Sequence, residues 1–356
     1  MLLALSAASA LAAAEIAPLA VVPSRDQKIV RRWSIEGDPH GVAIGNDGTL
    51  YVGLAKPQAV IAVDPKNGAI LRKIVLDSAA IASTKELLTM RTNREGTRLY
   101  IANGSDESAS ILALPDLAVL REITIEGEPI RDIIPGPKGR YLYVLGRSVH
   151  VYDANGENEI HTLTDPEPMA IAASNDGSML AVVGSEDFGN TKATSVALYD
   201  TADFREIARD PLQTTDRITG ALFAAGDRAL VAISPEHLFD KRVMSRPPKT
   251  MTAGTDGAMR MSIDFGDLVN SERICLPEGS GPQIVTAATG NLILFAERRC
   301  NSSGAFTGSA SHITPASLYG VDAYAVAFDR ASNTLVTTER AGFLTIYKVP
   351  HAALAR

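Results

Sequence analysis

The hydrophobic positions of this chain recur in a repeated phrase. Residues 38–55 read DPHGVAIGNDGTLYVGLA: a lead-in with proline, an apolar strand, a glycine turn and a second apolar strand. The same order returns at 128–146 and at 167–184. Self-similarity with a period of roughly 20–50 residues is typical of repeat architectures. We therefore expect a fold built from repeated groups of strands.

One turn residue marks each repeat. These residues are Gly48, Gly96, Gly139, Gly177, Gly226, Gly290 and Asn333. Asparagine fits the last place because it tolerates left-handed backbone angles better than most residues. Each repeat reads as four short strands, and the fourth alternates apolar with charged residues, as a half-solvated outer strand does. Seven such units predict an all-β fold, a seven-bladed β-propeller.

The two ends of the chain are predicted to meet. Residues 29–40 (IVRRWSIEGDPH) match 119–130 (VLREITIEGEPI), which form the outermost strand of the second unit and the lead-in to the third. The last unit, 323–349, supplies only three strands. We expect the N-terminal strand to complete this last blade, which would leave no long free sheet edge.

The remaining segments complete the domain organisation. Residues 1–14 are apolar and small, and end in three alanines, so they resemble a secretory signal peptide. They are too short to span a membrane comfortably. A linker at 15–28, one propeller domain at 29–350 and a tail at 351–356 follow. We expect a periplasmic or secreted monomer with no stable membrane span. The net charge of −7 argues against nucleic acid as a partner.

Blade five carries extra length. Residues 235–257 form a basic, proline-broken insertion, which is either a functional loop or a tolerated surface insertion. The two cysteines, Cys275 and Cys300, form no CxxC motif, so a cysteine-based zinc cluster and haem attachment are unsupported. They are either a disulfide or two buried free thiols. Because Walker, Rossmann, HExxH and GxSxG patterns are also absent, we expect no cofactor and no metal.

The repeat also resembles a known family. Its residues Pro39, Asp47, Gly48 and the Leu-Tyr-Val run at 50–52 are similar to the repeat of YVTN-type seven-bladed β-propellers. The resemblance covers nearly everything after residue 28 and implies the fold. It does not imply one activity, because this family includes periplasmic binding proteins, lactonase-type enzymes, muconate-cyclising enzymes and propeller subunits of amine dehydrogenases.

Propeller geometry predicts which residues gather at the mouth of the central channel. The innermost strand of each blade begins there, so the residues after each lead-in form a ring. They are His40, Lys85 or Glu86, Arg131 with Asp132, Met169, Arg217 with Asp216, Gln283, and Asp322 with Tyr324. Lys241 in the insertion would overhang this ring. Arginines there could grip a carboxylate or phosphate, and histidine could move a proton. Alternatively, water and ion pairs such as Arg131–Asp132 fill the channel. His150 and His161 are expected on sheet faces.

Three functions fit this pattern. We expect an exported binding or interaction protein that uses the channel mouth for a small anionic ligand or for another exported protein. The first alternative is a lactonase-like or muconate-cyclase-like enzyme, with His40 as acid and base and with Arg131 and Arg217 as clamps. The second is a propeller subunit of a periplasmic redox complex of the amine dehydrogenase kind, whose redox centre would belong to a partner.

Overall fold

The computed structural model describes most of the first half of the propeller and the strands of the second. The described residues are 28–76, 89–102, 106–164, 166–188, 191–211, 218, 220–224, 227, 229–233, 237–243, 251–253, 259–261, 265–273, 285–286, 293–295, 303–309, 312–318, 323–329, 332, 334–339 and 341–348. Within these residues the regular secondary structure is all strand. The predicted signal peptide and tail, and residues 15–27 of the linker, lie outside them.

The described strands form seven four-stranded antiparallel sheets, one for each predicted blade. Blade one is β2 Pro39–Ile44, β3 Leu50–Ala55, β4 Gln58–Val63 and β5 Ile70–Val75. Blade two is β6 Thr89–Thr92, β7 Arg98–Ala102, β8 Ser108–Ala113 and β9 Val119–Thr124. Blade three is β10 Asp132–Pro135, β11 Tyr141–Leu145, β12 Val149–Asp153 and β13 Glu159–Leu163. Blade four is β14 Glu167–Ala173, β15 Met179–Phe188, β16 Thr191–Asp200 and β17 Glu206–Pro211.

The remaining blades follow the same order. Blade five is β18 Gly220–Ala224, β19 Ala229–Ile233, β20 His237–Val243 and β23 Phe265–Arg273, with a separate hairpin of β21 Met251–Ala253 and β22 Met259–Met261. Blade six is β24 Val285–Thr286, β25 Ile293–Phe295, β26 Ser303–Ser309 and β27 His312–Leu318. Blade seven is β28 Ala323–Asp329, β29 Thr334–Glu339, β30 Phe343–Lys348 and the N-terminal strand β1 Lys28–Ser34.

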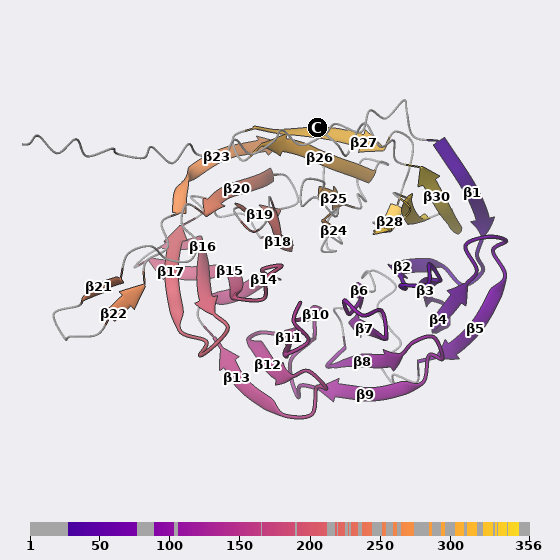
Figure 1. Cartoon of the computed structure of the whole chain (residues 1–356), viewed down its shortest axis with the longest axis horizontal. Coiled ribbons are helices and arrows are strands. Elements are labelled where there is room, and N and C mark those ends of the chain that lie inside the picture. The colour runs from indigo at the N-terminus through magenta and orange to yellow at the C-terminus, as the bar shows by residue number, and fades with distance from the viewer. Residues whose placement is uncertain are drawn as a thin grey trace, which may run out of the picture.

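The blades stand around a central axis (Figure 1). Each innermost strand contacts the next one, from β2 through β6, β10, β14, β18, β24 and β28 back to β2. The hydrophobic core lies between neighbouring blades because the inner strands are apolar on both faces. Val52 of β3 and Val336 of β29 share one cluster, and Tyr51 and Leu99 share another. The outermost strands, such as β5, are mostly exposed.

The predicted closure is confirmed. β1 pairs antiparallel with β30 along its whole length. The indole of Trp33 covers Gly68 in the turn between β4 and β5, where the backbone φ is +75° and a side chain would collide with the ring. Arg32 forms an ion pair with Glu339 at 2.7 Å and lies 3.9 Å from the centre of the Phe343 ring. The first strand therefore joins blade seven and also packs on blade one.

The turn glycines at 48, 96, 139 and 177 all have positive φ, as the repeat predicts. In blade five the described turn residue Asp227, one place after the predicted Gly226, has a positive φ of 65°. Its buried carboxylate accepts hydrogen bonds from the amides of Asn175 (2.7 Å) and Asp176 (3.2 Å) in the corresponding turn of blade four. This acid thus fastens two blades together.

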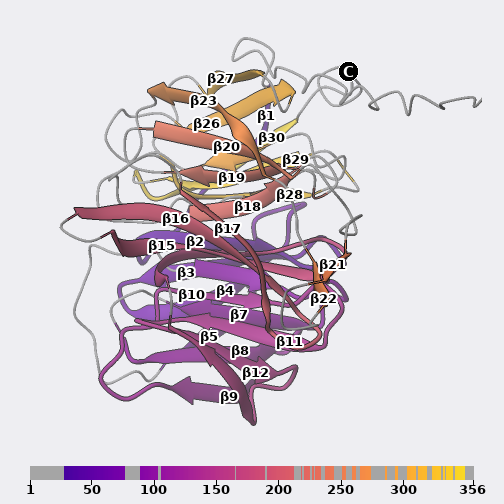
Figure 2. The ribbon, with the colours of Figure 1, turned by 90° about the vertical axis from the view of Figure 1, so that its left-hand side faces the viewer.

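The insertion in blade five differs from the expectation. Residues 237–243, predicted as loop, form β20 and pair with both β19 and β23. The extra length lies between β20 and β23, so it connects the third strand to the fourth. Because antiparallel strands alternate direction, the end of β20 and the start of β23 lie on the face opposite the channel mouth. Figure 2 shows the β21–β22 hairpin and the end of the β15–β16 hairpin on opposite sides of the molecule.

Candidate functional site at the channel mouth

Two predicted members of the mouth ring, His40 and Tyr324, are brought together. Their rings stack with centroids 3.9 Å apart and planes inclined by 26°. The His40 Nε2 atom lies 3.4 Å from Oδ1 of Asp38, and the hydroxyl of Thr338 donates to the His40 carbonyl at 2.7 Å. However, His40 is only 1% exposed and Tyr324 only 9%. The pair forms part of the packing between blades one and seven. A ligand-binding role for His40 stays a prediction.

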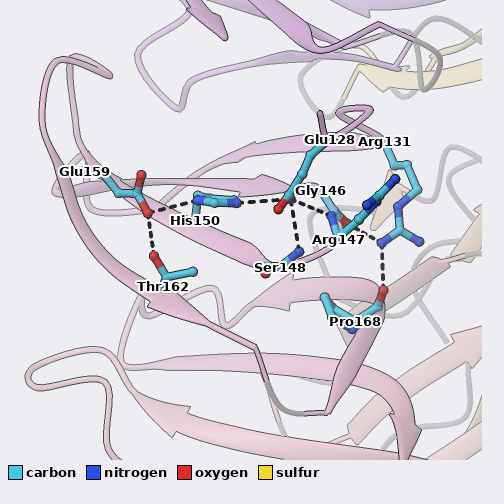
Figure 3. A network of polar contacts seen from close by, with 9 residues as sticks. All are labelled: Glu128, Arg131, Gly146, Arg147, Ser148, His150, Glu159, Thr162 and Pro168. Carbon is cyan, nitrogen blue, oxygen red and sulfur yellow. Dashed lines mark hydrogen bonds and ion pairs between the residues drawn. The ribbon is translucent and has the colours of Figure 1, made fainter. Parts of the chain in front are cut away.

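Arg131 also holds blades together. Its guanidinium donates to the carbonyl of Gly146 in blade three and to the carbonyl of Pro168 in blade four, the latter at 2.7 Å (Figure 3). Asp132 pairs instead with Arg91 of blade two, through Nε at 3.2 Å and Nη2 at 2.9 Å. The predicted neutralisation of Asp132 does occur, but the cation comes from the neighbouring blade. These side chains are half-buried and span the joints between blades two, three and four.

The structure does not describe every predicted site residue. Arg217, Gln283, Cys275 and Cys300 lie outside the described residues, as do Lys85, Glu86, Asp216 and Asp322. Lys241 lies in β20, where its backbone pairs with Leu230 and Leu268, and its side chain is outside the described part. Met169 packs partly buried against the core cluster of blades four and five. The described members of the predicted ring are thus His40, Arg131, Asp132, Met169 and Tyr324, and the ring as a ligand site stays a prediction.

A polar network in blade three was not predicted. His150 in β12 lies between two carboxylates: its Nδ1 is 2.9 Å from Glu159 of β13, and its Nε2 is 3.2 Å from Glu128 of the lead-in (Figure 3). The same oxygen of Glu128 accepts the amides of Arg147 (2.8 Å) and Ser148 (3.3 Å). The lead-in and the loop between β11 and β12 are therefore joined at the mouth face. His150 does lie within a sheet as expected, but it has two specific partners.

Both carboxylates of this network are more acidic than usual. Burial raises the pKa of Glu128, but the hydrogen bonds from His150 and from the amides of Arg147 and Ser148 outweigh it, so the net shift is downward. Burial likewise raises the pKa of Glu159, and the bonds from Thr162 and His150 more than offset it. The two acids are therefore ionised at neutral pH on either side of the imidazole. Because both ring nitrogens are engaged, the arrangement orients a loop more readily than it transfers protons to a ligand.

A cavity of about 270 Å³ lies in the channel between the inner strands of blades seven, one, two and three. Its described lining comprises Val42, Ala43, Ile44, Met90, Arg91, Thr92, Ile134, Pro135, Val326, Ala327 and Phe328. Arg91 brings the one charged side chain to this lining among the described residues, and Asp132 already accepts two of its hydrogen bonds. The cavity is just below the range of roughly 300–1,000 Å³ that is usual for ligand pockets.

Two kinds of feature are absent from the described residues. Within the described ranges, three or more histidine, cysteine or acidic side chains nowhere gather as they would around a metal ion. The same part of the chain contains no helix of the length and hydrophobicity needed to cross a membrane.

Comparison with solved structures places the fold. The β-propeller domain of Cps50 (Swd1) from Myceliophteria thermophila is similar with a TM-score of 0.65 and 14% identity, over 91% of this chain and 100% of that one. Hydrazine synthase from Kuenenia stuttgartiensis is similar with a TM-score of 0.62 and 13% identity, over 88% and 97%. No protein-family model and no curated protein sequence matches the chain, so the YVTN resemblance stays a prediction. The chain is therefore similar to β-propellers in fold.

Proposed function

We propose that this protein is an exported β-propeller that binds another exported protein through its mouth face, with the β15–β16 hairpin as the main recognition element. The single observation that carries the proposal is the length of that hairpin. Its two strands have ten residues each, whereas the corresponding strands of blades one to three have five or six.

The pairing of the strands supports this assignment. β14 pairs with β15 only as far as Ser185, and β17 pairs with β16 only as far as Ser195. Beyond these points, among the described residues, β15 and β16 pair only with each other, out to Phe188 and Thr191. At about 3.3 Å per residue, the free part extends roughly 10 Å beyond the blade. Its two edges, to which no other described strand pairs, suit contact with a partner, since an unpaired strand edge offers backbone donors and acceptors.

The base of the hairpin is held in place. Glu186 at the start of the free part forms an ion pair with Arg209 of β17, and Arg209 also contacts Glu206. An anchored hairpin loses less conformational freedom on binding than a mobile loop would. This favours a role in recognition over that of a passive extension.

The enzyme alternative has less support. A lactonase-like or cyclase-like reaction would use His40 and Arg131, and both are engaged in contacts between blades. A small anionic ligand remains the second candidate, because Arg91 reaches the channel cavity. Inorganic phosphate and simple carboxylates would raise the melting temperature if they bound there, and Arg91→Met would remove the effect.

The hairpin can be shortened without disturbing its turn. Deleting residues 187–188 and 191–192 joins the Glu186–Ala193 pair directly to Gly189-Asn190, a sequence suited to a two-residue turn, and keeps the ion pair of Glu186 with Arg209. In crosslinking experiments on exported fractions, we expect the wild-type chain to capture one specific protein and the shortened chain to lose it at unchanged thermal stability. Removing residues 251–261, the hairpin of the opposite face, is the matched control and should leave capture intact. Capture that survives the β15–β16 deletion, or no specific capture by the wild type, would contradict the proposal.

A further inference from the structure

Large aliphatic side chains gather on the outer rim of one half of the propeller. Among the described residues, all the exposed large hydrophobic side chains lie on β1, β5, β9 and β13, the outermost strands of four consecutive blades. They are Ile29, Val30, Ile70, Leu71, Val75, Val119, Leu120 and Ile160, each between 48% and 58% exposed. Such a concentration of exposed aliphatic groups marks interaction surfaces.

The fold requires a bulge at these places but not an aliphatic side chain. In each of the four strands the register shifts at the same position, which leaves Val30, Leu71, Leu120 and Ile160 without a partner residue. Bulges protect sheet edges from pairing with other strands. In blade four the bulged residue, Ile207, is instead buried and follows the charged Glu206. The exposed aliphatic groups are therefore a property of this half of the rim.

On β1 and β5 these groups are accompanied by positive charge. The two strands contain Lys28, Arg31, Arg32, Arg72 and Lys73 and no acidic residue. The turn between β4 and β5 adds the exposed Lys66 and the half-buried Asp64, whose carboxylate accepts the amide of Lys66. By contrast, β9 and β13 carry Glu122 and Glu159. We call Ile29, Val30, Ile70, Leu71 and Val75, with Arg31, Lys66, Arg72 and Lys73, the rim patch.

The rim patch is continuous across two blades. Arg31 of β1 donates to the carbonyl of Pro65 in the turn that precedes β5, and the Trp33 ring covers Gly68 of the same turn. Among the described residues, Asp116 forms an ion pair with a cation of the rim patch: its Oδ1 lies 3.3 Å from Nη2 of Arg72. Both side chains are more than half exposed. An ion pair this exposed is weak, so Arg72 can exchange Asp116 for a stronger anion.

We propose that the rim patch binds the surface of a lipid bilayer that carries anionic headgroups. Aliphatic side chains flanked by lysine and arginine suit the boundary between acyl chains and phosphates. The net charge of −7 on the whole chain would keep other faces away from such a membrane and so orient the molecule. A protein partner is less well matched, because protein interfaces centre on aromatic anchors seated in pockets.

Vesicle co-sedimentation of the full chain tests this proposal. Vesicles of phosphatidylcholine with an equal part of phosphatidylglycerol are compared with phosphatidylcholine alone, at low and high salt. We expect binding only to the anionic vesicles, weakened by salt. Ile70→Ser with Leu71→Ser should weaken it roughly tenfold, and Lys73→Glu should weaken it without removing an apolar group. Val119→Ser with Leu120→Ser on β9 is the matched control and should bind like the wild type.

Several outcomes would overturn the proposal. They are equal binding to both kinds of vesicle, no binding to either, and an equal loss in the β9 control. Concentration-dependent dimerisation without vesicle binding, lost in the Ile70/Leu71 variant, would assign the patch to a second copy of the chain instead. Melting temperatures of all variants establish that they are folded, and Lys73→Glu, a single exposed substitution, serves if the double variant is not.

Discussion

The imidazole of His40 lies face to face with the phenol ring of Tyr324, and both rings are buried where the first blade meets the last. The two residues belong to β2 and β28, the innermost strands of blades one and seven. Residues that the repeat places at the channel mouth therefore serve to pack blade against blade. The stack is one of the contacts that hold the ring together where the two ends of the chain meet.

Truncating either ring should destabilise the protein. We expect His40→Ala and Tyr324→Ala each to lower the free energy of unfolding by about 2–3 kcal/mol, in the upper part of the usual range for buried sites. The double variant should lose about 0.5–1.5 kcal/mol less unfolding free energy than the two single variants together. Each single variant already removes the whole stacking interaction, so the double variant loses it only once. Urea unfolding of the wild type, the two single variants and the double variant measures these free energies. Strict additivity would show that the rings pack independently.

The acids around His150 should make stability depend on pH. The folded-state pKa values of Glu128 and Glu159 lie below the ordinary value of 4.5. Their stabilising contribution is therefore complete above about pH 4.5 and is lost as the pH falls through the lower folded-state values. Replacing His150 by Leu removes one cause of both shifts and should reduce the loss of stability between pH 6 and pH 3.

His161 provides the control for this experiment. His161 lies in β13, the strand next to β12, and its ring stacks on that of Phe204 with the centroids 5.2 Å apart. It does not belong to the network around Glu128. His161→Gln should keep the wild-type dependence of unfolding free energy on pH. If His150→Leu also keeps that dependence, the network does not set the acid sensitivity.

The link between blades four and five rests on Asp227. Replacing it by Ala leaves the amides of Asn175 and Asp176 without their acceptor, and we expect a loss of about 1–3 kcal/mol in unfolding free energy. Asp203 accepts the amide of Arg205 in an exposed turn, where water can replace the carboxylate. Asp203→Ala should therefore cost less than Asp227→Ala in thermal or urea unfolding, and an equal cost would contradict the proposed link.

Gly68 and Trp33 should be strongly coupled. A Cβ atom on Gly68 would lie 2.3 Å from Trp33 Cδ1, so Gly68→Ala must displace the indole as well as strain the backbone. We expect Gly68→Ala to lower the free energy of unfolding by about 2–4 kcal/mol in the wild type, where strain and clash add. In a Trp33→Ala background, where only the backbone strain remains, we expect about 1–2 kcal/mol. Gly48→Ala, with nothing within 4 Å of its Cβ, is the control for backbone strain alone.

The sequence predicted the blades and their closure because both depend on local periodicity. The alternation of apolar residues defines strands such as Leu50–Ala55, and the likeness of 29–40 to 119–130 identifies β1 as an outer strand. β20 was missed because its charged residues, Asp240 to Arg242, resemble a loop next to prolines. These residues form a strand because β20 pairs with β19 and β23, contacts that the local sequence does not indicate.

The site was less predictable because it depends on contacts between blades. The ring position of His40 follows from the repeat, but its burial depends on Tyr324, at the other end of the chain. The partner of Asp132 is Arg91 of the preceding blade, not the adjacent Arg131. Likewise, the contact of His150 with Glu128 joins a strand to a lead-in, and no spacing rule within one strand indicates it.

The pairing of β1 with β30 has a consequence for the order of folding. β1 is synthesised first, yet its partner ends at Lys348, so blade seven cannot form until nearly the whole chain exists. Bringing such distant segments together costs loop entropy and slows folding. A growing chain can complete its middle blades before β1 has a strand to pair with. Synthesis of β30 thus decides when the ring becomes a single cooperative unit, and truncation before Phe343 should leave the two ends of the ring unjoined.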